Sequence, residues 1–329
     1  MKFVVYGAGG IGGVIGARLL LAGFEVTLIA RGEHAQVMQS NGLKLIAPDG
    51  QHRFKPNVVT SPQSLQLDKH TAVLMCMKSQ HMQTALEDLS KNPSAPAAHI
   101  VCVQNGIPNE PLATRFFPYG QVYASVVNLP AMFLTPGEVV THAKGCGGIL
   151  DTGLYPFGSN DFVLEYVQAL NKAGFSAFAD NNVMRWKYAK LLLNLVNALQ
   201  ACLQDFENSG ELRRRAKKEA LACYEAAGIS CASREELNKR RHDANQQPLY
   251  EMADIPGYER QAGSSWQSLA RGKSDIETNF LNGEISLLGK MHQVATPVND
   301  LCVSVAAEVV AQNLPPCAFT VEEFMRRLK

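Results

Sequence analysis

The chain has 329 residues, a net charge of +1 and 46% hydrophobic residues, which suggests about two globular domains with cores of their own. The near-zero net charge gives no indication of nucleic-acid or membrane binding, and no apolar run approaches the ~20 residues that span a bilayer. Met1 leads directly into the first predicted strand, which argues against a signal peptide. We therefore expect a soluble cytoplasmic enzyme.

Cysteine and histidine patterns indicate no metal site. The eight cysteines form no C-x-x-C pair, and several lie in apolar predicted strands or helices. Such thiols are typical of a reducing compartment rather than of a disulfide framework. The eight histidines show no metal-ligand spacing.

The first predicted elements are a strand over residues 1–6, a glycine turn and an apolar helix over about 11–22. Gly7, Gly9 and Gly12 have G-x-G-x-x-G spacing between them. The first glycine allows the tight turn, the second lets a pyrophosphate approach, and the third lets the helix pack on the strand. The helix N-terminus then faces the phosphates. A glycine-rich turn without a ligand is the alternative. The predicted dinucleotide site comprises Gly7, Ala8, Gly9, Gly10, Ile11 and Gly12.

The second predicted strand, residues 25–30, indicates which dinucleotide binds. An NAD site usually ends this strand in an acid that binds the ribose 2′-hydroxyl. Here the first charged residue is Arg31, and a guanidinium suits a 2′-phosphate. The sequence therefore favours NADP over NAD, with a solvated loop arginine as the alternative.

The following elements continue the alternation of strands and helices. Continuous apolar runs are typical of central parallel strands, so residues 1–181 are predicted to form an α/β, doubly wound Rossmann-type domain. Lys78 and Asn105 each follow a strand, and ligands bind at the carboxyl ends of such strands. The predicted strands cover 71–77, 99–103, 121–129 and 175–179, with extended segments over 138–142 and 148–151 and a helix over 161–172.

From about residue 185 long helices replace the strands, so residues 182–329 are predicted to form a mostly α-helical second domain. A basic run over 213–218 is interpreted as a solvated helix face. Residues 242–263 are predicted to form a long loop, a feature that is often functional in compact domains. The predicted helices cover 185–204, 211–227, 234–241, 264–293 and 298–312.

One predicted helix carries a narrow polar stripe. Lys190, Asn194 and Asn197 are spaced i, i+4 and i+7 and so share a face, while the other residues of 191–199 are apolar. Such a stripe on a mostly buried helix favours the lining of a cleft over a solvent-facing seam. Burial there would lower the lysine pKa and suit Lys190 to proton donation.

A second group of candidates lies near residue 270. Ser264 and Ser265 open a predicted helix, where hydroxyl and N–H groups can hold a carboxylate; a simple serine N-cap is the alternative. Glu277 lies on the shoulder of an apolar face, so its carboxylate needs a partner. A salt bridge, a substrate hydroxyl and a nicotinamide ribose would each serve.

Across nearly its full length the chain resembles the ketopantoate reductase (2-dehydropantoate 2-reductase) family. The resemblance implies a Rossmann domain and a helical domain with the active site between them. It also implies NADPH-dependent reduction of ketopantoate to D-pantoate, on the route to pantothenate and coenzyme A. The features that carry it are the Gly7–Gly12 turn, Arg31, Lys78, Gln104-Asn105-Gly106, Lys190 with Asn194, Ser264-Ser265, and Glu277 followed by Asn282-Gly283.

The resemblance further implies roles for these residues. The glycine turn and Arg31 would hold NADP, with Lys78 and Glu277 near the cofactor, and Asn105 would touch cofactor and substrate. Lys190 would be the general acid that protonates the new alkoxide. The substrate carboxylate and hydroxyl would be oriented by Asn194, Asn197, Ser264 and Ser265.

The chain departs from the family pattern in three places. The family usually has a tryptophan two residues before its catalytic lysine, where this chain has Tyr188 before Lys190. Lys187 is the rival acid, and Lys190 is preferred because Asn194 follows it at i+4. The second asparagine, Asn197, comes one residue early and lacks the following proline. Residues 128–136 form a longer segment than the family norm.

Two other functions stay open at this point. A paralogous enzyme would reduce a different 2-keto acid or act on a hydroxy acid. A non-catalytic NADP-binding sensor would keep the glycine turn and Arg31 but would not need Lys190, Asn194 or Glu277. The sequence does not set the oligomeric state, and a homodimer remains open.

Overall fold

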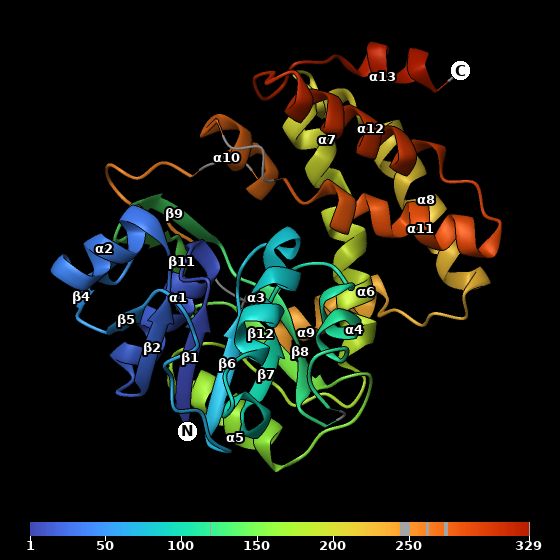
Figure 1. The fold of residues 1–329 in the computed structure, drawn as a ribbon. Helices are drawn as coiled ribbons and strands as arrows, with labels where there is room; N and C mark the ends of the chain where they lie inside the picture. The colour runs from blue at the N-terminus through green and yellow to red at the C-terminus, as the bar shows by residue number, and fades with distance from the viewer. Residues whose placement is uncertain (119, 244–250, 261–262, 273–275, 329) are drawn as a thin grey trace. The chain divides into compact units, whose positions relative to one another are not determined.

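The computed structural model describes all residues except 119, 244–250, 261–262, 273–275 and 329, and its described residues form two compact units (Figure 1). Unit 1 comprises Met1–Gln104, Asn109–Met184 and Ser233–Arg260. Unit 2 comprises Asn105–Pro108, Arg185–Ala232 and Gln261–Lys329. Among the helices of the described part, none is long and apolar enough for a membrane span.

Unit 1 is built on a seven-stranded sheet in the order β12-β8-β7-β6-β1-β2-β5. Neighbouring strands are parallel except for the antiparallel pair β12 and β8. The strand order reverses at β1, so its carboxyl end lies at the switch point where open α/β sheets bind ligands. The strands are β1 (Lys2–Tyr6), β2 (Glu25–Ile29), β5 (Asn57–Val59), β6 (Thr71–Met75), β7 (His99–Cys102), β8 (Val122–Asn128) and β12 (Ile149–Leu154).

Helices cover both faces of this sheet, which is why its strands are apolar on both sides. On β1, Phe3 and Val5 belong to one core cluster and Val4 to the other. The first cluster packs under α1 (Gly10–Leu21) and α5 (Asp161–Lys172), and the second under α3 (Met82–Ser90) and α4 (Asn109–Ala113). The predicted Rossmann-type fold is confirmed.

A second sheet in the order β4-β3-β10-β9 packs against α1. A Cβ at Gly13 would lie 2.6 Å from Val139 Cγ1, so a glycine is needed where α1 meets this sheet. Of these four strands only β10 was predicted from the sequence, as the extended segment over 138–142. Strand β4 is mostly polar and exposed, and β9 lies in the segment that looked long. These strands are β3 (Leu43–Ala47), β4 (Gly50–Phe54), β9 (Ala131–Thr135) and β10 (Glu138–Thr141).

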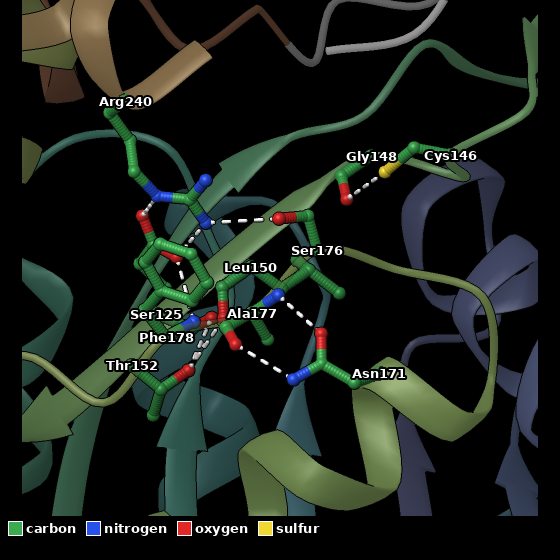
Figure 2. A network of polar contacts seen from close by, with 11 residues as sticks. Ser125, Cys146, Gly148, Leu150, Thr152, Asn171, Ser176, Ala177, Phe178 and Arg240 are labelled. Carbon is green, nitrogen blue, oxygen red and sulfur yellow. Dashed lines mark hydrogen bonds and ion pairs between the residues drawn. The ribbon is translucent and has the colours of Figure 1, made fainter. Parts of the chain in front are cut away.

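Residues 233–243 and 251–260, expected in the second domain, pack within unit 1. Strand β13 (Glu251–Met252) pairs with β11 (Ala143–Lys144), and Arg240 of α9 (Arg234–Asp243) is buried against the sheet (Figure 2). Its Nε donates to Asp151 Oδ2 over 2.7 Å, and its guanidinium carbon lies 3.8 Å from the ring centroid of Phe178. The long-loop prediction is untested over 244–250 and 261–262, which lie outside the described residues.

The predicted strand over 175–179 is reduced to isolated bridges at Ser176 and Ala179. The N–H groups of Leu150 and Thr152 donate to the carbonyls of Ser176 and Phe178, so this segment is still bonded to β12. Ala177 bonds to the Asn171 side chain through both its N–H and its carbonyl, each over 2.9 Å (Figure 2). A side chain of α5 therefore pairs the backbone groups that this segment does not use toward β12.

Unit 2 is helical, as predicted. Its core cluster includes Leu199, Leu212, Val305 and Phe324. The predicted helix over 185–204 breaks at Leu195, and the one over 264–293 is interrupted after Ala270, where Gly272 has a φ of +64°. Glycine in that conformation is typical of helix C-termini. The helices are α6 (Val183–Asn194), α7 (Val196–Cys202), η3 (Phe206–Asn208), α8 (Gly210–Ala226), α10 (Ser264–Ala270), η4 (Thr278–Phe280), α11 (Asn282–His292), α12 (Pro297–Ala311) and α13 (Val321–Arg327).

Candidate active site

Two positions of the glycine turn at the carboxyl end of β1 leave no room for a side chain. Gly7 has a φ of +96°, and a Cβ there would lie 2.6 Å from Met77 N. A Cβ at Gly12 would lie 2.3 Å from Gly7 O and 2.9 Å from Val5 Cγ1, so α1 packs directly on β1. At Gly9, in contrast, a Cβ would meet no described atom within 4 Å. The backbone at Gly9 is thus open on the side where its Cβ would stand, next to the start of α1 at Gly10.

His34, which the sequence interpretation passed over, fixes this turn. Its Nε2 lies 2.7 Å from the Ala8 carbonyl, and its Nδ1 accepts from Gly137 N–H over 2.9 Å. Because Nδ1 accepts, the ring proton belongs on Nε2 and is donated to Ala8. The ring also packs edge-on against Phe133. The sequence could have pointed to His34 as a residue near the cofactor site, because it follows Arg31 by three residues.

The predicted cationic candidates of unit 1 follow neighbouring strands. Arg31 is exposed after β2 and stands at the N-cap of α2 (Gly32–Asn41). Lys78 is half-buried after β6 and precedes η1 (Ser79–His81). Since β6, β1 and β2 are adjacent and parallel, both cations lie at the carboxyl ends of the strands, as the glycine turn does.

The polar stripe of unit 2 is divided between two helices. Lys190 and Asn194 lie on α6, Leu195 interrupts the helix, and Asn197 lies on α7. Asn194 is 6% exposed, and within the described part of the chain its Nδ2 has no hydrogen-bond partner. Lys190 is half-buried, whereas the rival Lys187 is only 3% exposed.

The structure brings Asn197 next to the start of α10. Gly263 N–H donates to Gln200 Oε1 over 3.1 Å, and Asn197 Oδ1 lies 3.8 Å from the point where a Cβ would stand at Gly263. Gly263, not a serine, occupies the N-cap of this helix. Ser264 and Ser265 follow it directly, and Ser265 is buried. Gln200 was missed, although it continues the stripe three residues after Asn197.

Asn105 and Glu277 lie on neighbouring segments of unit 2. Gly106 has a φ of +82°, and a Cβ there would lie 2.7 Å from Phe280 O, so the loop after β7 packs closely on η4. Glu277 is 8% exposed and stands at the N-cap of η4. The candidate residues therefore fall into one group in unit 1 and several adjoining groups in unit 2.

Comparisons with known proteins cover most of the chain. Family models described as "Ketopantoate reductase PanE/ApbA" and "Ketopantoate reductase PanE/ApbA C terminal" match residues 3–153 and 182–310. A 2-dehydropantoate 2-reductase of Mesorhizobium japonicum is 33% identical over 95% of this chain and 99% of its own length. One from Pyrococcus horikoshii is 28% identical over 92% and 95%.

Solved structures show the same architecture. A PanE/ApbA family ketopantoate reductase from Ralstonia eutropha JMP134 has a TM-score of 0.79 at 27% identity, covering 95% of this chain and 99% of its own. D-mandelate dehydrogenase with NADH and anilino(oxo)acetate has a TM-score of 0.77 at 20% identity, with 95% and 99% covered. At that identity the second likeness concerns the fold alone.

Proposed function

The chain belongs to the ketopantoate reductase family, and from this premise we propose that it reduces the 2-keto group of ketopantoate to D-pantoate with NADPH, in pantothenate and coenzyme A biosynthesis. The observation that carries the proposal is the glycine turn, which is closed to side chains at Gly7 and Gly12 and open at Gly9. It lies at the switch point of the sheet, where a dinucleotide pyrophosphate is expected.

The residues around this turn fit a phosphorylated nicotinamide cofactor. Backbone N–H groups at the start of α1 would bind the pyrophosphate, and exposed Arg31 would bind the 2′-phosphate in the place where an NAD site has an acid. We assign Lys78, Asn105 and Glu277 to further cofactor contacts, and the remaining turn residues Ala8, Gly10 and Ile11 to the phosphate site. NADPH, when bound, supplies the hydride that reduces the keto carbon.

We assign Lys190 as the general acid. Its ammonium would stabilise the negative charge that develops on the keto oxygen and then transfer a proton to that oxygen, giving the hydroxyl. Half-burial of Lys190 leaves its side chain partly accessible, and this supports it over Lys187.

Five polar residues would contact the substrate. Asn194 has a buried amide nitrogen with no partner in the described part of the chain, and such a donor costs free energy unless a ligand pairs with it. Asn197, Ser264 and Ser265 adjoin one another at the junction of α7 and α10 and would bind the carboxylate and the hydroxyl, with Asn105 touching substrate as well as cofactor.

The proposal is tested by NADPH oxidation with ketopantoate and a panel of other 2-keto acids, repeated with NADH. We expect ketopantoate with NADPH to give the highest kcat/KM. Turnover of another keto acid alone would keep the chemistry and change the substrate. Binding of NADPH without any turnover would contradict the enzymatic proposal and favour a sensor.

A further inference from the structure

A chain of buried polar groups crosses the core of unit 2. Asn282 and Asn299 are each 0% exposed. Asn282 Nδ2 donates to the Leu195 carbonyl over 3.1 Å and to Asn299 Oδ1 over 3.0 Å. Asn299 Nδ2 in turn donates to Glu219 Oε2 over 2.8 Å and to the Ala216 carbonyl over 3.1 Å. Two side-chain amides therefore connect α8, α12 and α11 to the residue that separates α6 from α7.

The far end of this chain is firmly held. The Glu219 carboxylate also accepts from the backbone N–H groups of Val298 and Asn299, over 3.0 and 3.1 Å, at the start of α12. Charge-assisted bonds to the first N–H groups of a helix are strong and directional. Asn299 is therefore fixed, and it fixes the orientation of the Asn282 amide.

The near end of the chain lies at the break in the polar stripe. A side-chain group bonded into the hydrogen-bond ladder of a helix is a recognised cause of a kink, and Asn282 bonds to Leu195, where the helix is interrupted. Lys190 and Asn194 precede this point and Asn197 follows it. The geometry of the break therefore sets how the proposed acid is placed relative to part of the proposed substrate site.

Asn282 is also close in sequence to a second part of the candidate site. It begins α11 immediately after η4, whose Phe280 carbonyl lies against Gly106 and whose N-cap is Glu277. Its two donated bonds are all the hydrogen bonding that its side chain makes among the described residues, since its Oδ1 has no partner there. Those two hydrogen bonds fix the orientation of the Asn282 side-chain amide.

We propose that Asn282 is a positioning residue for the reduction. Its hydrogen bond to the Leu195 carbonyl fixes the junction of α6 and α7. Lys190 and Asn194 on one side of the junction and Asn197 on the other can then contact the same substrate molecule. It acts through Leu195 and not by contact with the reacting groups. The inference rests on the proposed function.

The kinetic test uses two substitutions and matched controls. Asn282→Ala removes both donors, and Asn282→Leu removes them while keeping a similar volume. Asn279→Ala and Asn279→Leu make the same changes at an exposed asparagine three residues earlier. We expect kcat/KM for the keto acid, per folded molecule, to fall about 10- to 100-fold in both Asn282 variants, mainly through kcat, as misplaced catalytic groups do. NADPH affinity and both controls should change less than about threefold.

A residue that only supports the fold would lower Tm and leave the kinetics of the folded molecule intact. That pattern would overturn the proposal. If the alanine variant does not fold, the leucine variant provides the same comparison.

A second readout does not depend on activity. We expect backbone amides of residues 191–199 to exchange hydrogen for deuterium faster in the Asn282 variants than in wild type or the Asn279 controls. Unchanged exchange there, in an active wild-type enzyme, would refute the positioning role. If wild type reduced no 2-keto acid, the proposed function would fail, while the exchange measurement would still test the link from Asn282 to Leu195.

Discussion

The glycines of unit 1 and the buried asparagines of unit 2 contribute in different ways. In unit 1, Gly7, Gly9 and Gly12 matter through the backbone space that a missing side chain leaves. In unit 2, Asn194, Asn282 and Asn299 matter through the amide groups that they hold in the core. Substitutions at the three glycines should therefore act by adding volume, and those at the three asparagines by removing one polar group.

The largest effect is expected from Lys190→Ala in unit 2. Removing a general acid should lower kcat by roughly 10²- to 10⁴-fold, while the NADPH dissociation constant changes little because no volume is added. Steady-state kinetics and fluorescence titration measure the two quantities. Lys187→Ala is the control, and we expect it to lower Tm more because that lysine is 3% exposed. If Lys187→Ala folded but lost turnover while Lys190→Ala kept it, Lys187 and not Lys190 would be the general acid.

In unit 1, two alanine substitutions three residues apart should behave differently. Gly12→Ala places a methyl group 2.3 Å from a backbone oxygen, and we expect it to destabilise the fold by about 3 kcal/mol or more. Gly9→Ala meets no described atom within 4 Å, so Tm should hold while NADPH affinity falls. Thermal melts measure the Tm of both variants, and titration measures their NADPH affinity. If Gly9→Ala kept the NADPH affinity of wild type, this turn would not be the site that binds the cofactor phosphates.

Much of unit 1 could be predicted because its signals are local. The glycines, the apolar strands and the helix Asp161–Lys172 each follow from residues next to one another in the sequence. What could not be predicted depends on distant partners. Arg240 leaves no local mark of its pairing with Asp151, 89 residues earlier, so the packing of residues 233–260 in unit 1 was not anticipated.

That buried pair offers an exception to the contrast, since it is a side-chain effect in unit 1. Arg240→Met leaves the Asp151 carboxylate buried without its partner, and we expect a loss of about 3–5 kcal/mol in unfolding free energy. Adding Asp151→Leu should restore part of it, because neither charge is then buried, while the Phe178 N–H loses its acceptor. Chemical denaturation measures both. Equal losses in the single and double variants would show that packing, and not charge, dominates.

Arg31→Ala tests the specificity for NADP. A charge-assisted bond to the 2′-phosphate contributes about 1.5–3 kcal/mol, so the NADPH dissociation constant should rise roughly 10- to 100-fold. NADH affinity should change little, and so should both affinities in Arg115→Ala, which alters another exposed arginine. Equal weakening of NADPH and NADH would refute the role in 2′-phosphate binding.

The smallest effect concerns Glu284, in the first turn of α11. Burial raises its pKa to about 7 from a usual value near 4.5. The folded state thus holds the proton more tightly than the unfolded state, so stability falls as pH rises from about 4.5 through 7. Glu284→Gln should raise Tm by roughly 2–4 °C at pH ~8 and leave it nearly unchanged at pH ~5.

Glu211→Gln, at an exposed acid in the first turn of α8, is the control for the glutamate at position 284. It should change Tm little at either pH. A lower Tm for Glu284→Gln at the higher pH would mean instead that the helix N-terminus stabilises the carboxylate.

The candidate residues of unit 2 could be found from the sequence, but their arrangement could not. The spacing of Lys190, Asn194 and Asn197 predicted one continuous helical face. The break at Leu195 coincides with a hydrogen bond from Asn282, 87 residues away, which no local pattern encodes. Gly272, by contrast, was a local stop signal that the predicted helix over 264–293 ran through.

The return of residues 233–260 to unit 1 has a consequence for biosynthesis. The last residue of unit 1 is Arg260, although its preceding segment ends at Met184, 76 residues earlier. At roughly 5–20 residues per second, the ribosome adds those residues in about 4–15 s. During that interval a nascent Rossmann sheet would lack α9 and β13, and the Asp151 carboxylate would lack its ion pair with Arg240. Chaperone contacts during synthesis should therefore concentrate on this edge of the sheet.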